Sequence, residues 1–162
     1  MNIFDYAMQI EKEGEALYQS FAKDSPQKGL ATIFTGLAEQ EHKHYKTFKK
    51  MKYSEGTESI DTPFLDNVKS IFTAWKKEKH KFKFKISQAD LYRKALDIEQ
   101  KSIDLYMEKS KEVDSDKQRQ IFKKIANEEK SHYEIMENII EFITKPERWV
   151  EHAEFSKIGE EY

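Results

Sequence analysis

The chain has 162 residues, a usual size for one domain, and this length can bury a core without disulfides. It contains no cysteine, which excludes thiolate metal sites and iron–sulfur clusters, and its net charge of −2 offers no basic field to nucleic acid. No apolar run approaches the roughly 20 residues that cross a bilayer, and residues 1–15 lack the features of a signal peptide. We therefore expect a cytoplasmic protein that binds neither nucleic acid nor membranes.

The first predicted element is a helical hairpin over residues 1–52. Its first helix has apolar residues at helical spacing, namely Ile3, Ala7, Ile10, Leu17 and Phe21. Lys23 to Pro26 interrupts the pattern, and we expect Ser25 to cap a second helix with Pro26 at its first position. That second helix is predicted over residues 27–52, where apolar positions continue at the same spacing.

A crossover is predicted over residues 53–86. Residues 56–63 have the composition of a loop, and residues 64–75 have the pattern of an amphipathic helix. Residues 76–85 are basic and could meet an anionic partner, although a solvated connector is the favoured interpretation.

A second helical hairpin is predicted over residues 87–143, with a C-terminal extension over residues 144–162 that includes a short helix. Ser87 and Asp90 form a capping-box-like start, and Asp114-Ser115 restarts the chain before its last long helix. Short connections within a hairpin make its helices antiparallel neighbours.

The second hairpin is a gapless repeat of the first. A shift of 88 residues aligns identical residues between residues 7–45 and 95–133. The aligned pairs include Ala7/Ala95, Ile10/Ile98, Glu11/Glu99, Leu17/Leu105, Tyr18/Tyr106, Ile33/Ile121, Phe34/Phe122, Ala38/Ala126, Glu41/Glu129, His44/His132 and Tyr45/Tyr133. The repeat predicts one all-α domain over residues 1–162, a four-helix bundle with one long crossover between its second and third helices and a short C-terminal helix.

Two of the repeated segments carry a Glu-x-x-His motif. Glu41 and His44 form the first motif, and Glu129 and His132 form the second. Residues three apart lie on one face of a helix, so each pair can offer an oxygen and an imidazole nitrogen to one point. A single motif of this kind is usually surface charge, but here each is matched by a mid-helix glutamate, Glu11 or Glu99.

These six residues predict a centre for two metal ions. Four carboxylates facing one core would repel one another and would each be unfavourable to bury unpaired, whereas two divalent cations balance their charge. Carboxylate-rich ligation with one imidazole per metal suits iron, with manganese or a mixed iron–manganese pair as alternatives. One glutamate from each of two helices and Glu-x-x-His from each of the others is the pattern of ferritin-like diiron proteins. The remaining histidines, His42, His80 and His152, are expected to be solvated.

The motifs resemble those of the rubrerythrin-type ferritin-like diiron family over residues 1–52 and 87–143. The resemblance implies that Glu41 and Glu129 bridge the metals, and that Glu11, Glu99, His44 and His132 are terminal ligands. It also implies that Tyr18 and Tyr106 hydrogen-bond the ligating carboxylates, and we treat both as candidate catalytic residues. Because each tyrosine follows a glutamate by seven residues, we expect it to share that glutamate's stripe. A homodimer is expected from the same resemblance.

Two departures from the family bear on function. Ser102 stands where peroxidase-type rubrerythrins carry an additional glutamate, and the chain has no four-cysteine rubredoxin domain. Electrons would therefore come from a separate donor protein. The favoured hypothesis is an oxidoreductase of oxidative stress that reduces hydrogen peroxide or dioxygen at two irons. The alternatives are a ferroxidase or iron-handling protein without other substrate turnover, and a bundle in which metal only stabilises the fold.

Overall fold

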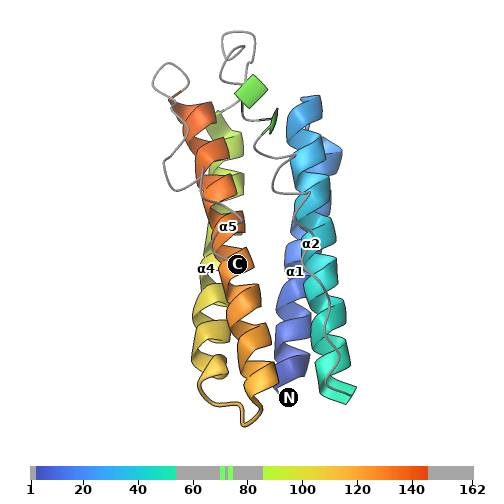
Figure 1. Ribbon diagram of the computed structural model, residues 1–162. Coiled ribbons are helices and arrows are strands. Elements are labelled where there is room, and N and C mark those ends of the chain that lie inside the picture. Colours follow the sequence, from blue (N-terminus) through green and yellow to red (C-terminus); the bar gives the residue numbers. More distant parts are fainter. Residues whose placement is uncertain (1–2, 54–69, 72, 75–85, 146–162) are drawn as a thin grey trace.

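Four long helices form the protein, as the computed structural model shows for residues 3–53, 70–71, 73–74 and 86–145. They are α1 (Ile3–Asp24), α2 (Lys28–Tyr53), α4 (Ile86–Ser110) and α5 (Asp116–Thr144). Figure 1 shows them side by side, with α1 antiparallel to α2 and α4 antiparallel to α5. The predicted all-α four-helix bundle is confirmed. None of the described helices combines the length and the apolarity needed to span a membrane.

The start of α2 differs from the prediction. Its cap is Gln27 and not Ser25, because the Gln27 side-chain oxygen accepts from the Leu30 N–H at 2.6 Å and its carbonyl accepts from the Ala31 N–H. The start of α5 follows the prediction, since the Ser115 hydroxyl accepts from the Gln118 N–H at 3.3 Å. Gln27 and Ser115 are 88 residues apart, so the two caps are equivalent positions of the repeat.

The predicted cap of α4 at Ser87 is also wrong. The helix already includes Ile86, so Ser87 lies within its first turn. Asp90 forms an ion pair with Arg93 at 2.5 Å, an (i, i+3) contact on the helix surface.

The core consists of two apolar clusters, one toward each end of the bundle. The first contains Tyr18, Phe34, Ala95 and Ile135, and the second contains Ala7, Phe48, Tyr106 and Ala126, among others. Along every helix, the chain passes from one cluster to the other through a short polar stretch. These stretches hold the six ligand-type residues, so the bundle places them between two apolar clusters.

Most of the crossover and the C-terminal extension lie outside the described residues. This applies to the predicted loop over 56–63, most of the predicted helix over 64–75, the basic run over 76–85, the C-terminal helix, His80 and His152. The described residues 70–71 and 73–74 are helical, and Ile71 packs against the first apolar cluster.

Candidate metal centre

All six ligand-type residues meet in the interior between the two apolar clusters. Each exposes 4% or less of its surface. Their ligand atoms fall into two groups, each with its atoms within 4.8 Å of one another. The first group is Glu11, Glu41, His44 and Glu129, and the second is Glu41, Glu99, Glu129 and His132. Glu41 and Glu129 belong to both groups, while each group has its own glutamate and histidine.

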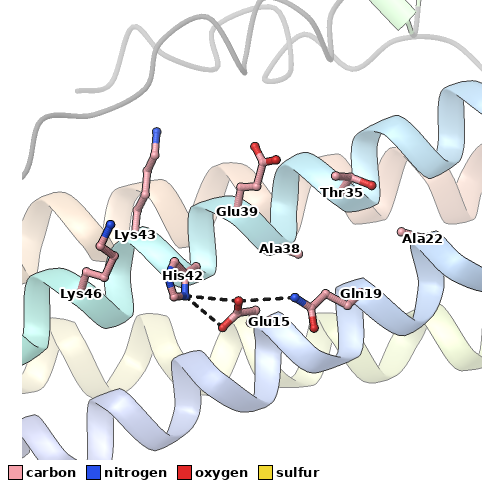
Figure 2. Close-up of a pocket in the computed structure, with 9 residues that line it drawn as sticks. All are labelled: Glu15, Gln19, Ala22, Thr35, Ala38, Glu39, His42, Lys43 and Lys46. Atoms are coloured by element: carbon pink, nitrogen blue, oxygen red, sulfur yellow. Dashed lines mark hydrogen bonds and ion pairs between the residues drawn. The ribbon is translucent and has the colours of Figure 1, made fainter.

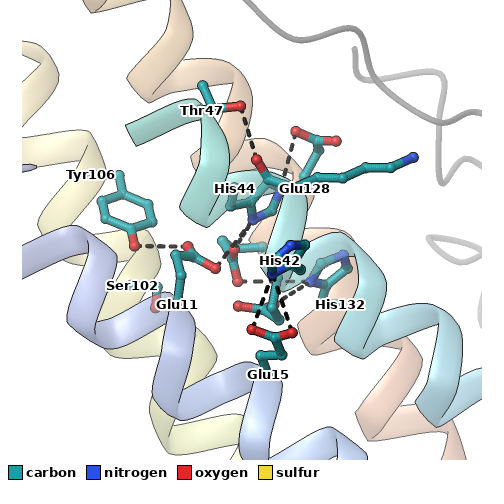
Figure 3. A network of polar contacts seen from close by, with 12 residues as sticks. Glu11, Glu15, His42, His44, Thr47, Ser102, Tyr106, Glu128 and His132 are labelled. Atoms are coloured by element: carbon teal, nitrogen blue, oxygen red, sulfur yellow. Dashed lines mark hydrogen bonds and ion pairs between the residues drawn. The ribbon is translucent and has the colours of Figure 1, made fainter. Parts of the chain in front are cut away.

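Each histidine lies close to one carboxylate of the opposite hairpin and to one of its own. His44 Nδ1 lies 2.7 Å from Glu129 Oε1 and 3.4 Å from Glu11 Oε2. His132 Nδ1 lies 3.0 Å from Glu41 Oε1 and 3.7 Å from Glu99 Oε1. The two imidazole rings are nearly parallel, with centroids 5.8 Å apart. Each motif therefore contributes to a site that only the packing of both hairpins completes (Figure 3).

The tyrosines bond to carboxylates in a crossed pattern. The Tyr18 hydroxyl donates to Glu99 Oε1 at 2.7 Å, and the Tyr106 hydroxyl donates to Glu11 Oε1 at 2.8 Å. The expected contact with a candidate ligand carboxylate is present, but it does not run along the tyrosine's own helix. Seven residues span about 10 Å along a helix axis, so a tyrosine and the glutamate of its own helix lie nearly two turns apart. The facing helix brings the other glutamate closer.

Burial and mutual repulsion shift the protonation of the carboxylates. Burial raises the pKa of Glu11 to about 6, and burial with the charges of Glu41 and Glu99 raises the pKa of Glu129 to about 8. Burial also raises the pKa of Glu41 well above its ordinary value. Glu99 differs, because its close contacts with Glu129 and His132 and the hydrogen bond from Tyr18 outweigh its burial and lower its pKa. Protons are thus held at carboxylates that would have to be ionised to bind cations.

The neighbouring carboxylates act on the histidines in the opposite direction to burial. Burial alone would lower the pKa of His44, but Glu11 and Glu129 raise it well above the ordinary value. Close contacts with Glu129, Glu41 and Glu99 raise the pKa of His132 in the same way, against its burial. The cluster therefore attracts positive charge to its centre, first of all as protons.

The buried ligand atoms fit a metal centre. Within the described residues, Glu11 Oε2, Glu99 Oε2, both oxygens of Glu129 and both ring nitrogens of His44 have no hydrogen-bond partner of suitable geometry. Unsatisfied polar groups are unfavourable in an interior, and six of the seven such side-chain atoms among the described residues belong to ligand-type residues, the seventh being Asn138 Oδ1. Carboxylate oxygens and imidazole nitrogens without hydrogen-bond partners are ligands that iron or manganese would bind.

Two residues at the centre were not predicted from the sequence. Glu128 is buried, and its Oε2 lies 3.4 Å from His44 Nε2, on the far side of the ring from Glu129. Gly14 lies against Glu41, since a Cβ at Gly14 would be only 2.9 Å from Glu41 Oε2. The repeat gives no direct signal for Glu128, whose counterpart is Gln40. A signal for Gly14 was present, because it lies three residues after Glu11 on the same helix face.

Ser102 is buried at the centre but offers no carboxylate. Its hydroxyl donates to the carbonyl of Ile98, in its own helix, at 3.0 Å. His42 lies outside both ligand groups, with 43% of its side chain exposed and Nδ1 at 3.3 Å from Glu15. It lines a surface groove of about 540 Å³ between α1 and α2 (Figure 2).

The rubrerythrin family model matches residues 2–140 of the chain, which include all six ligand-type residues and both tyrosines. No match was found among the curated proteins or among the solved structures.

Proposed function

The chain belongs to the rubrerythrin family, and we propose on this basis that it is a non-haem diiron-carboxylate oxidoreductase that reduces hydrogen peroxide or dioxygen. One observation carries the proposal: the two four-residue ligand groups share Glu41 and Glu129, which are buried between the two apolar clusters. Shared carboxylates suit two ions held close together, as in other two-metal sites.

Each residue has a defined role in this proposal. Glu41 and Glu129 would bridge the two irons, which the residues' membership of both groups supports. Glu11 and His44 would complete one position, and Glu99 and His132 the other. Six protein side chains for two ions leave coordination positions open, which reactive sites require. Two ferrous ions would supply the two electrons that reduce an O–O bond, and two protons are taken up when peroxide becomes water.

The tyrosines would orient the terminal carboxylates. Burial, together with the nearby glutamates, raises the pKa of Tyr18 and Tyr106 well above the ordinary value, so both hydroxyls stay protonated. A protonated hydroxyl at 2.7–2.8 Å fixes one oxygen of Glu99 or Glu11 and leaves the second oxygen free to bind metal. Each tyrosine also holds a proton near the centre.

A separate donor protein would return the electrons, since the chain has no cysteine for an iron–sulfur or rubredoxin site of its own. A homodimer and a cytoplasmic location complete the proposal.

A ferroxidase or iron-handling protein is the second candidate, and the state of Ser102 favours it. A serine offers no additional carboxylate to the centre, and the Ser102 hydroxyl is bonded to the Ile98 carbonyl of its own helix. In this case ferrous iron would be the substrate, and dioxygen the oxidant.

The test is anaerobic loading with ferrous iron followed by separate exposure to peroxide and to dioxygen. The oxidoreductase proposal predicts rapid oxidation by one of the two oxidants, reversed by a reductant over many cycles at a constant two irons per chain. Iron that accumulates beyond two per chain during slow oxidation by dioxygen would contradict it and favour iron handling. Glu41→Ala serves as the control without the shared carboxylate.

A further inference from the structure

We infer that Gly14 is a positioning residue whose missing side chain gives the Glu41 carboxylate its place between the two ligand groups. This inference rests on the proposed metal centre. A Cβ at residue 14 would lie 2.9 Å from Oε2, 3.3 Å from Cδ and 3.5 Å from Cγ of Glu41. The first distance is shorter than a carbon and an oxygen can tolerate without movement. The carboxylate of Glu41 thus lies directly against the backbone of α1.

No requirement of the backbone explains a glycine at this place. Gly14 is buried in the middle of α1 (Ile3–Asp24), far from the turn or cap where a glycine is usually needed. Glycine in a helix interior is less favourable than alanine. The close approach of the Glu41 carboxylate is therefore the reason for a glycine at this position.

A side chain at residue 14 would disturb the ligand and leave the fold intact. The atom that it would meet is the end of a flexible side chain, which can move away by rotation. That same end is the carboxylate that both donor groups share. Its displacement would change the position of a bridging ligand, while the apolar packing around it stays in place.

The equivalent residue of the second hairpin is different. Ser102 is the repeat counterpart of Gly14, and it is buried with its hydroxyl bonded to Ile98. The position in α4 thus already accommodates a Cβ and a hydroxyl. The repeat supplies a matched control, because Ser102→Ala changes the same place in the other half and retains the Cβ.

The experiment compares the parent, Gly14→Ala and Ser102→Ala in anaerobic calorimetric titration with ferrous iron. The melting temperature of each metal-free protein is measured in parallel. We expect Gly14→Ala to bind iron about 10–100-fold more weakly, as is usual when the support of a ligand is lost. We expect its metal-free melting temperature to equal or exceed that of the parent, because alanine favours the helix. Ser102→Ala should keep the parent's affinity.

Two results would overturn the inference. One is a Gly14→Ala protein that binds two irons with the parent's affinity. The other is a metal-free Gly14→Ala protein that melts well below the parent, since Gly14 would then serve packing. A parent that binds no iron would instead overturn the proposed function, so the two failures are distinguishable.

Discussion

At the scale of single residues, the closest contacts of the tyrosines and histidines at the centre run from one hairpin to the other. Tyr18 of α1 donates to Glu99 of α4, and Tyr106 of α4 donates to Glu11 of α1. His44 and His132 likewise approach the glutamate of the opposite motif. The tyrosine and the histidine of each hairpin therefore contact a glutamate of the other hairpin.

The crossed pattern predicts which pairs of substitutions interact. Tyr18→Phe removes a hydrogen bond to a charged group, and we expect it to lower the free energy of unfolding by about 1.5–3 kcal/mol. Combined with Glu99→Gln, its effect should be strongly non-additive, because both changes remove the same contact. Combined with Glu11→Gln, the effects should be more nearly additive.

Chemical denaturation of the metal-free variants measures these free energies. The pair Tyr106→Phe and Glu11→Gln is the mirror-image control, for which the repeat predicts strong coupling as well. Coupling of Tyr18 to Glu11 larger than its coupling to Glu99 would contradict the crossed assignment.

At the scale of helices, the repeat made most of the bundle predictable. Apolar residues at helical spacing and the shift of 88 residues predict two hairpins, which correspond to α1–α2 and α4–α5. The helix starts were less predictable, because residue preferences favour serine as a cap and the hydrogen-bond geometry selects the residue that the first turn reaches. Gln27 holds that place in α2, and Ser25 is two residues too early.

The same limit applies to the site. The equivalent positions of the two Glu-x-x-His motifs and of the mid-helix glutamates Glu11 and Glu99 in the two repeats predicted that the six ligand-type residues meet. The helical period does not say which helix stands opposite, so the partners of Tyr18 and Tyr106 had to come from the structure. A neighbour such as Glu128 has no pattern of its own and is found only by its contact with His44.

The cap of α2 gives a prediction at this scale. Gln27→Ala removes the acceptor for the Leu30 N–H, and we expect a loss of about 1 kcal/mol in the free energy of unfolding. Ser25→Ala removes only the 3.3 Å hydrogen bond from the Ser25 hydroxyl to the Gln27 carbonyl, so its loss should be smaller, about 0.5 kcal/mol. Neither should alter metal content. A larger loss for Ser25→Ala in thermal or chemical unfolding would restore Ser25 as the cap.

At the scale of the whole molecule, the centre joins two hairpins through groups that repel one another when they are ionised. In the metal-free protein, Glu11 and Glu129 have pKa values of about 6 and about 8, above the ordinary carboxyl value of 4.5. The pKa values of His44 and His132 are raised as well. The folded state therefore binds more protons than the unfolded state over this range.

This linkage gives the sign of the pH dependence. Groups with raised pKa values in the folded state stabilise it at low pH, and their contribution is lost as pH rises through those values. The metal-free protein should thus melt at a lower temperature at about pH 8.5 than at about pH 6. This interval covers the pKa values of Glu11 and Glu129. Metal binding displaces these protons, so the stabilisation by metal should increase over the same range.

Melting curves of the metal-free and the metal-loaded protein at several pH values test this prediction. Manganese(II) is a suitable probe because it is not oxidised by air under mild conditions. The substitution Glu129→Gln should make the melting temperature of the metal-free protein depend less on pH. A metal-free protein that becomes more stable as pH rises from 6 to about 8 would contradict the assigned shifts.

The most direct test of the central claim is the ferrous iron content of the parent and four single variants, loaded without oxygen and freed of excess iron. The parent should retain two irons per chain. Glu41→Ala and Glu129→Ala should each lose both, since each removes a shared carboxylate, whereas Glu11→Ala and Glu99→Ala should lose mainly one. A parent that holds a single iron, or four variants that all keep the parent's content, would contradict a two-metal centre at these residues.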